Sequence, residues 1–139
     1  MDLQDPEGMF EDPWNPTPVE IRRWAHSDTD PPEQDWELAI DRYPSLLIEL
    51  IDDPSGAADA RCFLLRALYV YAGDKFRSGR STDSPDLSEL FTDASARGIP
   101  LKRWVERTRQ LFAGELPYSS DNWGLGGRLA REDCDLFKH

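Results

Sequence analysis

Few residues of this chain have the types and spacing that catalysis or metal binding requires. A zinc site needs clustered His and Cys ligands, and a nucleophilic serine of the elbow type needs the GxSxG pattern; neither is present. Adjacent carboxylates such as Asp52 and Asp53 lie in a segment with turn composition, whereas glycosidases need two carboxylates facing each other across a cleft. We therefore expect no catalytic residue, no metal site, no cofactor and no enzymatic activity.

Residues 124–128, GLGGR, are the nearest approach to a phosphate-binding loop. They lack both the GxGxxG spacing of a dinucleotide site and the GxxxxGK pattern of a P-loop. We expect these glycines to let Trp123 and the backbone pack closely against another element.

Arg66 is the most informative single charge, because it is the only charged side chain between Cys62 and Ala72. A buried guanidinium must be paired or hydrogen-bonded. One interpretation is an ion pair with a carboxylate on another helix. The other is a pocket that holds an anionic ligand, and a close carboxylate would count against it.

The acidic block 28–41, DTDPPEQDWELAID, is the candidate partner-binding surface. An aromatic anchor surrounded by carboxylates suits a basic partner. The alternative is that the Trp belongs to the core and the acids form a solvated face. The candidate residues are Asp28, Asp30, Glu33, Asp35, Trp36, Glu37 and Asp41.

The negative charge is concentrated in the first half of the chain. The net charge is −11 overall, and residues 1–60 hold 16 acids against three Arg, a net of −13. This distribution disfavours direct nucleic-acid binding and favours a basic protein partner, although solubility alone also explains acidity. No stretch is long enough to cross a membrane, and the N-terminus has no signal-peptide pattern. The two cysteines form no disulfide framework, so we expect a cytoplasmic protein with Cys62 as a small buried hydrophobe.

The fold class that the pattern predicts is all-α, a compact bundle of about six helices. Residues 58–77 form its central helix, because they are apolar nearly all round; a buried strand is the alternative. Residues 45–51 precede this helix, and the two resemble a HEAT-like helical hairpin. Other helices are expected from Thr17 to about Ser27, from Asp30 to Tyr43, from Ser84 toward Gly98 and from Ile99 to Phe112. Along the last of these, the exposed side is expected to carry Lys102, Arg103, Arg107 and Arg109.

Residues 1–16 hold three Pro and five acids, and we expect them to form a flexible acidic arm. Residues 17–139 then form a single helical domain. Phe10 and Trp14 either pin this arm to the domain or serve as anchors for a partner, and pinning is the favoured interpretation.

Three segments, EIRRWAHS, PEQDWELAI and DNWGLGGRLARE, resemble small uncharacterised proteins of actinobacteria. This resemblance covers the chain from residue 17 onward, and it implies no activity and assigns no residue a role.

The function that the sequence favours is non-catalytic binding of another protein through the acidic half. The most concrete form is an immunity- or inhibitor-type protein that blocks a basic partner such as a toxin or nuclease, by analogy of size and charge. A helical adaptor or scaffold subunit is the alternative. A small enzyme or ligand-binding protein with a pocket near Arg66 is the third class.

Overall fold

The computed structural model describes residues 10–27, 29–123 and 127–138. These residues form an all-α fold with eight α-helices and no strand. In chain order the elements are α2 (Pro18–Ala25), α3 (Glu37–Ile40), α4 (Pro44–Ile51), α5 (Ala58–Arg77), α6 (Pro85–Ser95), α7 (Ile99–Phe112), α8 (Ser120–Trp123), α9 (Arg128–Asp133) and the 3₁₀ helix η1 (Cys134–Lys138).

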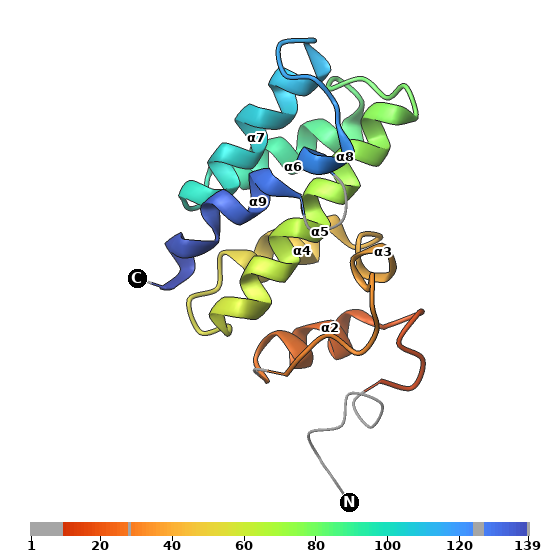
Figure 1. Ribbon diagram of the computed structural model, residues 1–139, viewed down its shortest axis with the longest axis vertical. Helices are drawn as coiled ribbons and strands as arrows, with labels where there is room; N and C mark the ends of the chain where they lie inside the picture. Colours follow the sequence, from red (N-terminus) through yellow and green to blue (C-terminus); the bar gives the residue numbers. More distant parts are fainter. Residues whose placement is uncertain (1–9, 28, 124–126, 139) are drawn as a thin grey trace, which may run out of the picture.

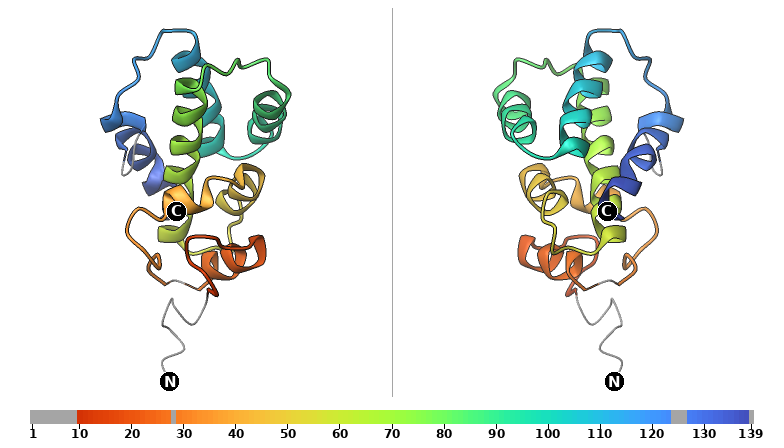
Figure 2. Two further views of the ribbon diagram at one scale, coloured as in Figure 1. Left: turned by 90° about the vertical axis from the view of Figure 1, so that its right-hand side faces the viewer. Right: turned by 90° about the vertical axis from the view of Figure 1, so that its left-hand side faces the viewer.

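Helix α5 is the centre of the molecule, as its composition predicts. Figure 1 labels the helices, and Figure 2 shows α5 upright, with α8 and α9 on one side and α4 and α6 on the other. Eleven of its 20 residues, from Ala60 to Gly73, are buried and cover all sides of the helix. The helix immediately before it in the chain, α4, packs against it. These contacts explain why a helix apolar nearly all round is stable here: its neighbours cover each face.

Helix α2 begins where its sequence signal places it. The Thr17 hydroxyl accepts a hydrogen bond of 3.2 Å from the Glu20 backbone N–H. The Glu20 carboxylate accepts one of 2.9 Å from the Thr17 N–H. This capping box satisfies two backbone donors that the first turn would otherwise leave unpaired.

The helix predicted from Asp30 to Tyr43 is much shorter in the structure, where α3 covers only Glu37–Ile40. Asp35 has a φ of 62°, in the left-handed region, which a right-handed helix cannot include. Trp36, Ala39 and Ile40 are nevertheless all buried, as helical spacing of apolar residues indicates.

Residues 10–16 are packed against the domain, although the sequence predicted a flexible arm over residues 1–16. The Phe10 side chain is buried and contacts the Trp36 ring edge to face, with the ring centroids 5.1 Å apart. The Tyr43 hydroxyl donates a hydrogen bond to the Pro16 carbonyl. Phe10 therefore pins the segment, whereas the Trp14 side chain is 46% exposed. The rest of the predicted arm lies outside the described residues.

Candidate functional site

Three acids of the predicted surface lie together on the loop between α2 and α3. Asp30, Glu33 and Asp35 are exposed, and no Lys, Arg or His among the described residues lies within ion-pair distance of them. Asp30 is also a fixed point of the loop, because its carbonyl accepts a hydrogen bond of 3.2 Å from the Trp24 indole. Asp28, the fourth acid predicted for this stretch, lies outside the described residues.

Trp36 is a core residue, and the prediction that it anchors a partner is wrong. Its side chain is fully buried, and its ring centroid lies 4.9 Å from that of Trp24 and 5.9 Å from that of Phe63. Its indole N–H donates a hydrogen bond of 2.7 Å to the Pro13 carbonyl. Burial of this ring holds the acidic loop against α5, so Trp36 positions the surface without belonging to it.

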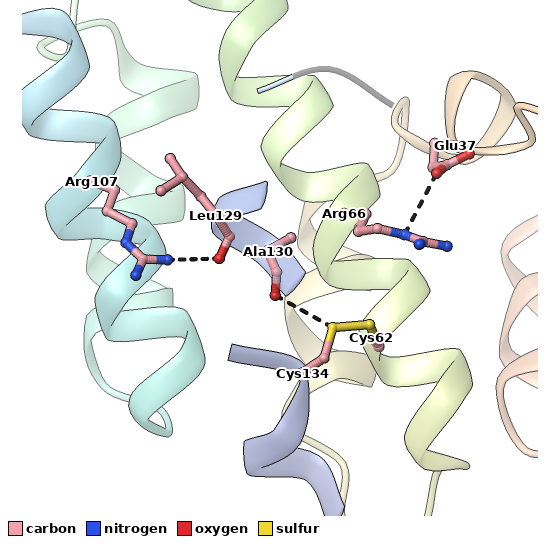
Figure 3. The surroundings of a disulfide bond; sticks show 7 residues. All are labelled: Glu37, Cys62, Arg66, Arg107, Leu129, Ala130 and Cys134. Atoms are coloured by element: carbon pink, nitrogen blue, oxygen red, sulfur yellow. Dashed lines mark hydrogen bonds and ion pairs between the residues drawn. A yellow bond between two sulfur atoms is a disulfide. The ribbon is translucent and has the colours of Figure 1, made fainter. Parts of the chain in front are cut away.

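Glu37 is also buried, which removes it from the predicted surface. It is 5% exposed, and its Oε2 lies 3.7 Å from Nε of Arg66. Figure 3 shows the two side chains directed toward each other from α3 and α5. The ion pair favoured for Arg66 from the sequence is therefore confirmed. The separation is longer than a hydrogen bond, and the buried Nε atom of Arg66 has no hydrogen-bond partner.

Asp41 lies apart from the acidic loop, at the C-terminal end of α3. It lines a separate hollow with Tyr71 and Asp74 of α5. Burial, and then the negative charge of Asp74, raise the pKa of Asp41 to about 6. The predicted acidic block is thus divided by the fold into an exposed loop and this half-buried carboxyl.

A hollow of about 520 Å³ lies between the acidic loop and α5. Its lining combines the apolar surfaces of Pro31, Pro32 and Phe63 with the charged groups of Glu33, Asp35, Glu37 and Arg66. A smaller hollow of about 150 Å³ shares Pro31, Phe63 and Arg66 and adds Asp30 and Asp59. A hollow therefore lies beside Arg66, and the charged groups of its lining are three carboxylates and this one guanidinium.

Two exposed apolar side chains lie on α3 or on the segment beside it, and sequence reasoning missed one of them, Leu38. Leu38 of α3 is 50% exposed and Trp14 is 46% exposed. Arg42 donates hydrogen bonds to the carbonyls of Ala39 and Trp14, which brings the segment that carries Trp14 beside α3. Its exposure could have been inferred from helical spacing, because Leu38 does not fall on the apolar stripe that its buried neighbours form.

Cys62 and Cys134 form a disulfide, which corrects the prediction of an unpaired, buried Cys62. Their Cα atoms are 5.1 Å apart although the residues are 72 positions apart in sequence. Figure 3 shows the bond joining α5 to the C-terminal segment. An even number of cysteines was the only sequence signal for this pairing, and it carries no information about proximity.

Arg107 is not on the exposed side of α7, where the sequence pattern placed it. Its side chain is 19% exposed and pairs with the fully buried Asp133. It also donates hydrogen bonds to the Tyr69 hydroxyl and to the Leu129 carbonyl. Arg103 donates to the same carboxylate over 2.7 Å. These contacts join α5, α7 and α9, so Arg107 has a structural role.

Gly73 of α5 allows the tail to approach closely, and sequence reasoning missed this glycine. Trp123 is buried, and a Cβ added to Gly73 would lie 3.4 Å from the Trp123 Cβ and 3.2 Å from the Tyr118 ring. Of the glycine-rich segment, residues 124–126 lie outside the described residues. Gly127 is the N-cap residue of α9.

Within the described ranges, no group of three or more His, Cys, Asp or Glu residues is placed to hold a metal ion. In the same part of the chain, none of the helices has the length and apolar character needed to traverse a bilayer.

The fold and the site define a small all-α protein with an exposed acidic loop, a hollow behind it and one disulfide. Comparisons of the chain with protein-family models, curated proteins and solved structures found no match. The chemistry of the acidic loop is therefore the basis for a functional proposal.

Proposed function

We propose that this protein binds a basic protein partner through the acidic loop, defined by Asp30, Glu33 and Asp35. The observation that carries the proposal is that these three exposed carboxylates form no ion pair with a described residue. By contrast, other acids of the first half are paired: Glu49 with Arg22, and Asp52 with Arg97. Unpaired like charges on one loop cost free energy unless a partner neutralises them.

The loop suits recognition because its backbone is held in place before a partner arrives. The buried Trp36 side chain and the Trp24–Asp30 hydrogen bond fix its two ends. A preorganised surface loses less conformational entropy on binding than a mobile one. Leu38 and Trp14 supply exposed apolar area near the charges, the combination found at protein interfaces.

An inhibitor of immunity type, which blocks the basic surface of a toxin or nuclease, is the most concrete form of this proposal. Its support is the net charge of −13 over residues 1–60, which would accelerate encounter with a positive surface. The activity is binding, without catalysis. An adaptor would use the same loop but bind several partners more weakly.

The cytoplasmic location expected from the sequence depended on cysteines without a partner. The Cys62–Cys134 disulfide favours an oxidising compartment instead, because reducing cytosols keep most thiols free. We therefore propose that the binding takes place in an oxidising environment.

The proposal can be tested by affinity capture from a lysate of the source organism with the wild-type protein and two charge-reversed variants. The first variant carries Asp30→Lys, Glu33→Lys and Asp35→Lys. The control carries Glu89→Lys, Glu106→Lys and Glu115→Lys, which reverses three exposed acids of the second half and changes the net charge equally. We expect one basic protein to be recovered by the wild type and by the control, but not by the loop variant.

Salt dependence separates an electrostatic complex from an apolar one. Association of the purified partner should slow by tenfold or more between low salt and about 0.5 M salt, because the charges are exposed. Equal capture by the loop variant would refute the role of the loop. Several weak partners in place of one would favour the adaptor.

A further inference from the structure

We infer that the hollow between the acidic loop and α5 receives a Lys or Arg side chain of the basic partner, with Glu37 as the carboxylate at its floor. This inference rests on the proposed function and specifies the group that the site recognises. It replaces the anionic ligand considered for Arg66 with a cationic one.

The charge of the lining determines the sign of the ligand. Three carboxylates, those of Glu33, Asp35 and Glu37, face one guanidinium, that of Arg66, so the described lining has a net charge of −2. The adjoining smaller hollow adds the carboxylates of Asp30 and Asp59. An anion brought to Arg66 would be repelled by this excess, whereas an ammonium or guanidinium group would be attracted.

Glu37 places a nearly buried carboxylate in the lining of the hollow. The residue is 5% exposed, and its close cation among the described residues is Arg66, whose Nε lies 3.7 Å from Oε2. No described side chain donates a hydrogen bond to this carboxylate, so its accessible oxygens face the hollow and its solvent. A cationic side chain that entered would donate N–H groups to them.

Arg66 complements this arrangement. Its guanidinium carbon lies 5.2 Å from the centre of the Phe63 ring, and its Nε atom is buried without an acceptor. A peptide that inserts a Lys or Arg side chain also brings backbone carbonyl groups. These carbonyls can accept from the exposed part of the Arg66 guanidinium, whose side chain is 28% exposed, while the inserted cation pairs with Glu37.

The walls of the hollow suit such a side chain. The hollow, of about 520 Å³, is wide open to solvent, so a side chain of a partner can enter it. Pro31, Pro32 and Phe63 form apolar walls, against which the methylene groups of Lys or Arg can pack while the charged end reaches a carboxylate.

The inference can be tested by NMR titration of the isotope-labelled full chain with capped single residues. The probes are N-acetyl-arginine methylamide and N-acetyl-lysine methylamide, with N-acetyl-glutamate methylamide, acetate and inorganic phosphate as anionic comparisons. We expect saturable shifts of the backbone amides of Glu37, Phe63 and Arg66 with the cationic probes alone. The Glu37→Gln variant should bind the cationic probes at least fivefold more weakly.

Two further variants keep the test decisive. Glu89→Gln alters an exposed acid beside another hollow, near Asp86 and Asp93, and should bind the cationic probes as the wild type does. If Glu37→Gln fails to fold, the double change Glu33→Gln and Asp35→Asn alters only exposed rim acids and should weaken binding at least threefold.

Saturable binding of phosphate, acetate or the glutamate probe at Arg66 would overturn the inference, as would the absence of saturable shifts with the cationic probes. Either result would overturn it even if charge reversal of the loop abolished capture of the partner, so the two proposals can fail separately.

Discussion

Arg107 donates a hydrogen bond of 3.0 Å to the carboxylate of Asp133, which is fully buried 26 positions further along the chain. Arg103 donates to the other oxygen of the same carboxylate. The pair anchors the C-terminal helix α9 to α7. Tyr69 of α5 joins the network, and burial raises the pKa of its hydroxyl to about 12. The hydroxyl therefore stays protonated at neutral pH and accepts from Arg107.

Replacing Asp133 by Asn should lower the free energy of unfolding by about 3 kcal/mol, because it leaves the largely buried Arg107 without a counter-charge. Urea denaturation followed by circular dichroism measures this loss. Glu132→Gln is the matched control, since Glu132 forms only an exposed pair with Arg128 at 3.7 Å, worth less than about 1 kcal/mol. Equal stability of the two variants would contradict the role of the network.

The disulfide should contribute about 4 kcal/mol to stability, because it closes a loop of 72 residues in the unfolded chain. Reduction with dithiothreitol, or the double change Cys62→Ala and Cys134→Ala, should lower the urea midpoint. Thiol titration of the unfolded oxidised protein should find no free thiol. Dithiothreitol should have no effect on the double variant, and an unchanged midpoint for the reduced wild type would refute the prediction.

Asp41 should make the protein less stable at neutral than at mildly acid pH. Its folded pKa of about 6 exceeds the usual 3.8, so the folded state binds more protons between these values and stability falls as pH rises through them. Asp41→Asn should therefore raise the free energy of unfolding at pH 7 by about 1–3 kcal/mol and change it little at pH 3.5.

Denaturation with urea from pH 3.5 to 7 measures the effect of Asp41→Asn. Asp59→Asn, a change of an exposed acid on the same helix bundle, serves as the control for loss of one charge. A stability profile of Asp41→Asn that runs parallel to that of the wild type would exclude Asp41 as the titrating group.

Asp35→Gly should stabilise the loop by about 0.5–1 kcal/mol, because glycine adopts a φ of 62° without the steric cost that a Cβ imposes. Asp35→Val should instead destabilise the protein by about 1–2 kcal/mol. Thermal melting of the two variants provides the comparison. Glu33 is not in the left-handed region, so the control change Glu33→Gly should lower the melting temperature. An equal fall in melting temperature for Asp35→Gly would contradict a steric cost at Asp35.

The sequence by itself determined the helical class and most of the helix positions. The apolar run from Cys62 to Ala72 predicted the central helix, and α5 spans the expected residues 58–77. The capping box of Thr17 and Glu20 marked the start of α2, and Ile99-Pro100 marked the start of α7. These signals are local, since periodicity and capping depend on residues within one turn of each other.

Only the tertiary structure decided which side chains reach the surface and which meet. Glu37 was predicted to lie on an acidic surface, and Trp36 either on that surface or in the core. Both follow the left-handed residue Asp35 and are buried, against Arg66 and Phe63 respectively. The cystine, and the pairing of Arg107 with Asp133, join residues far apart in sequence. Such contacts depend on how whole helices pack against α5, and the packing is set by the summed fit of many side chains, which no single stretch of sequence contains.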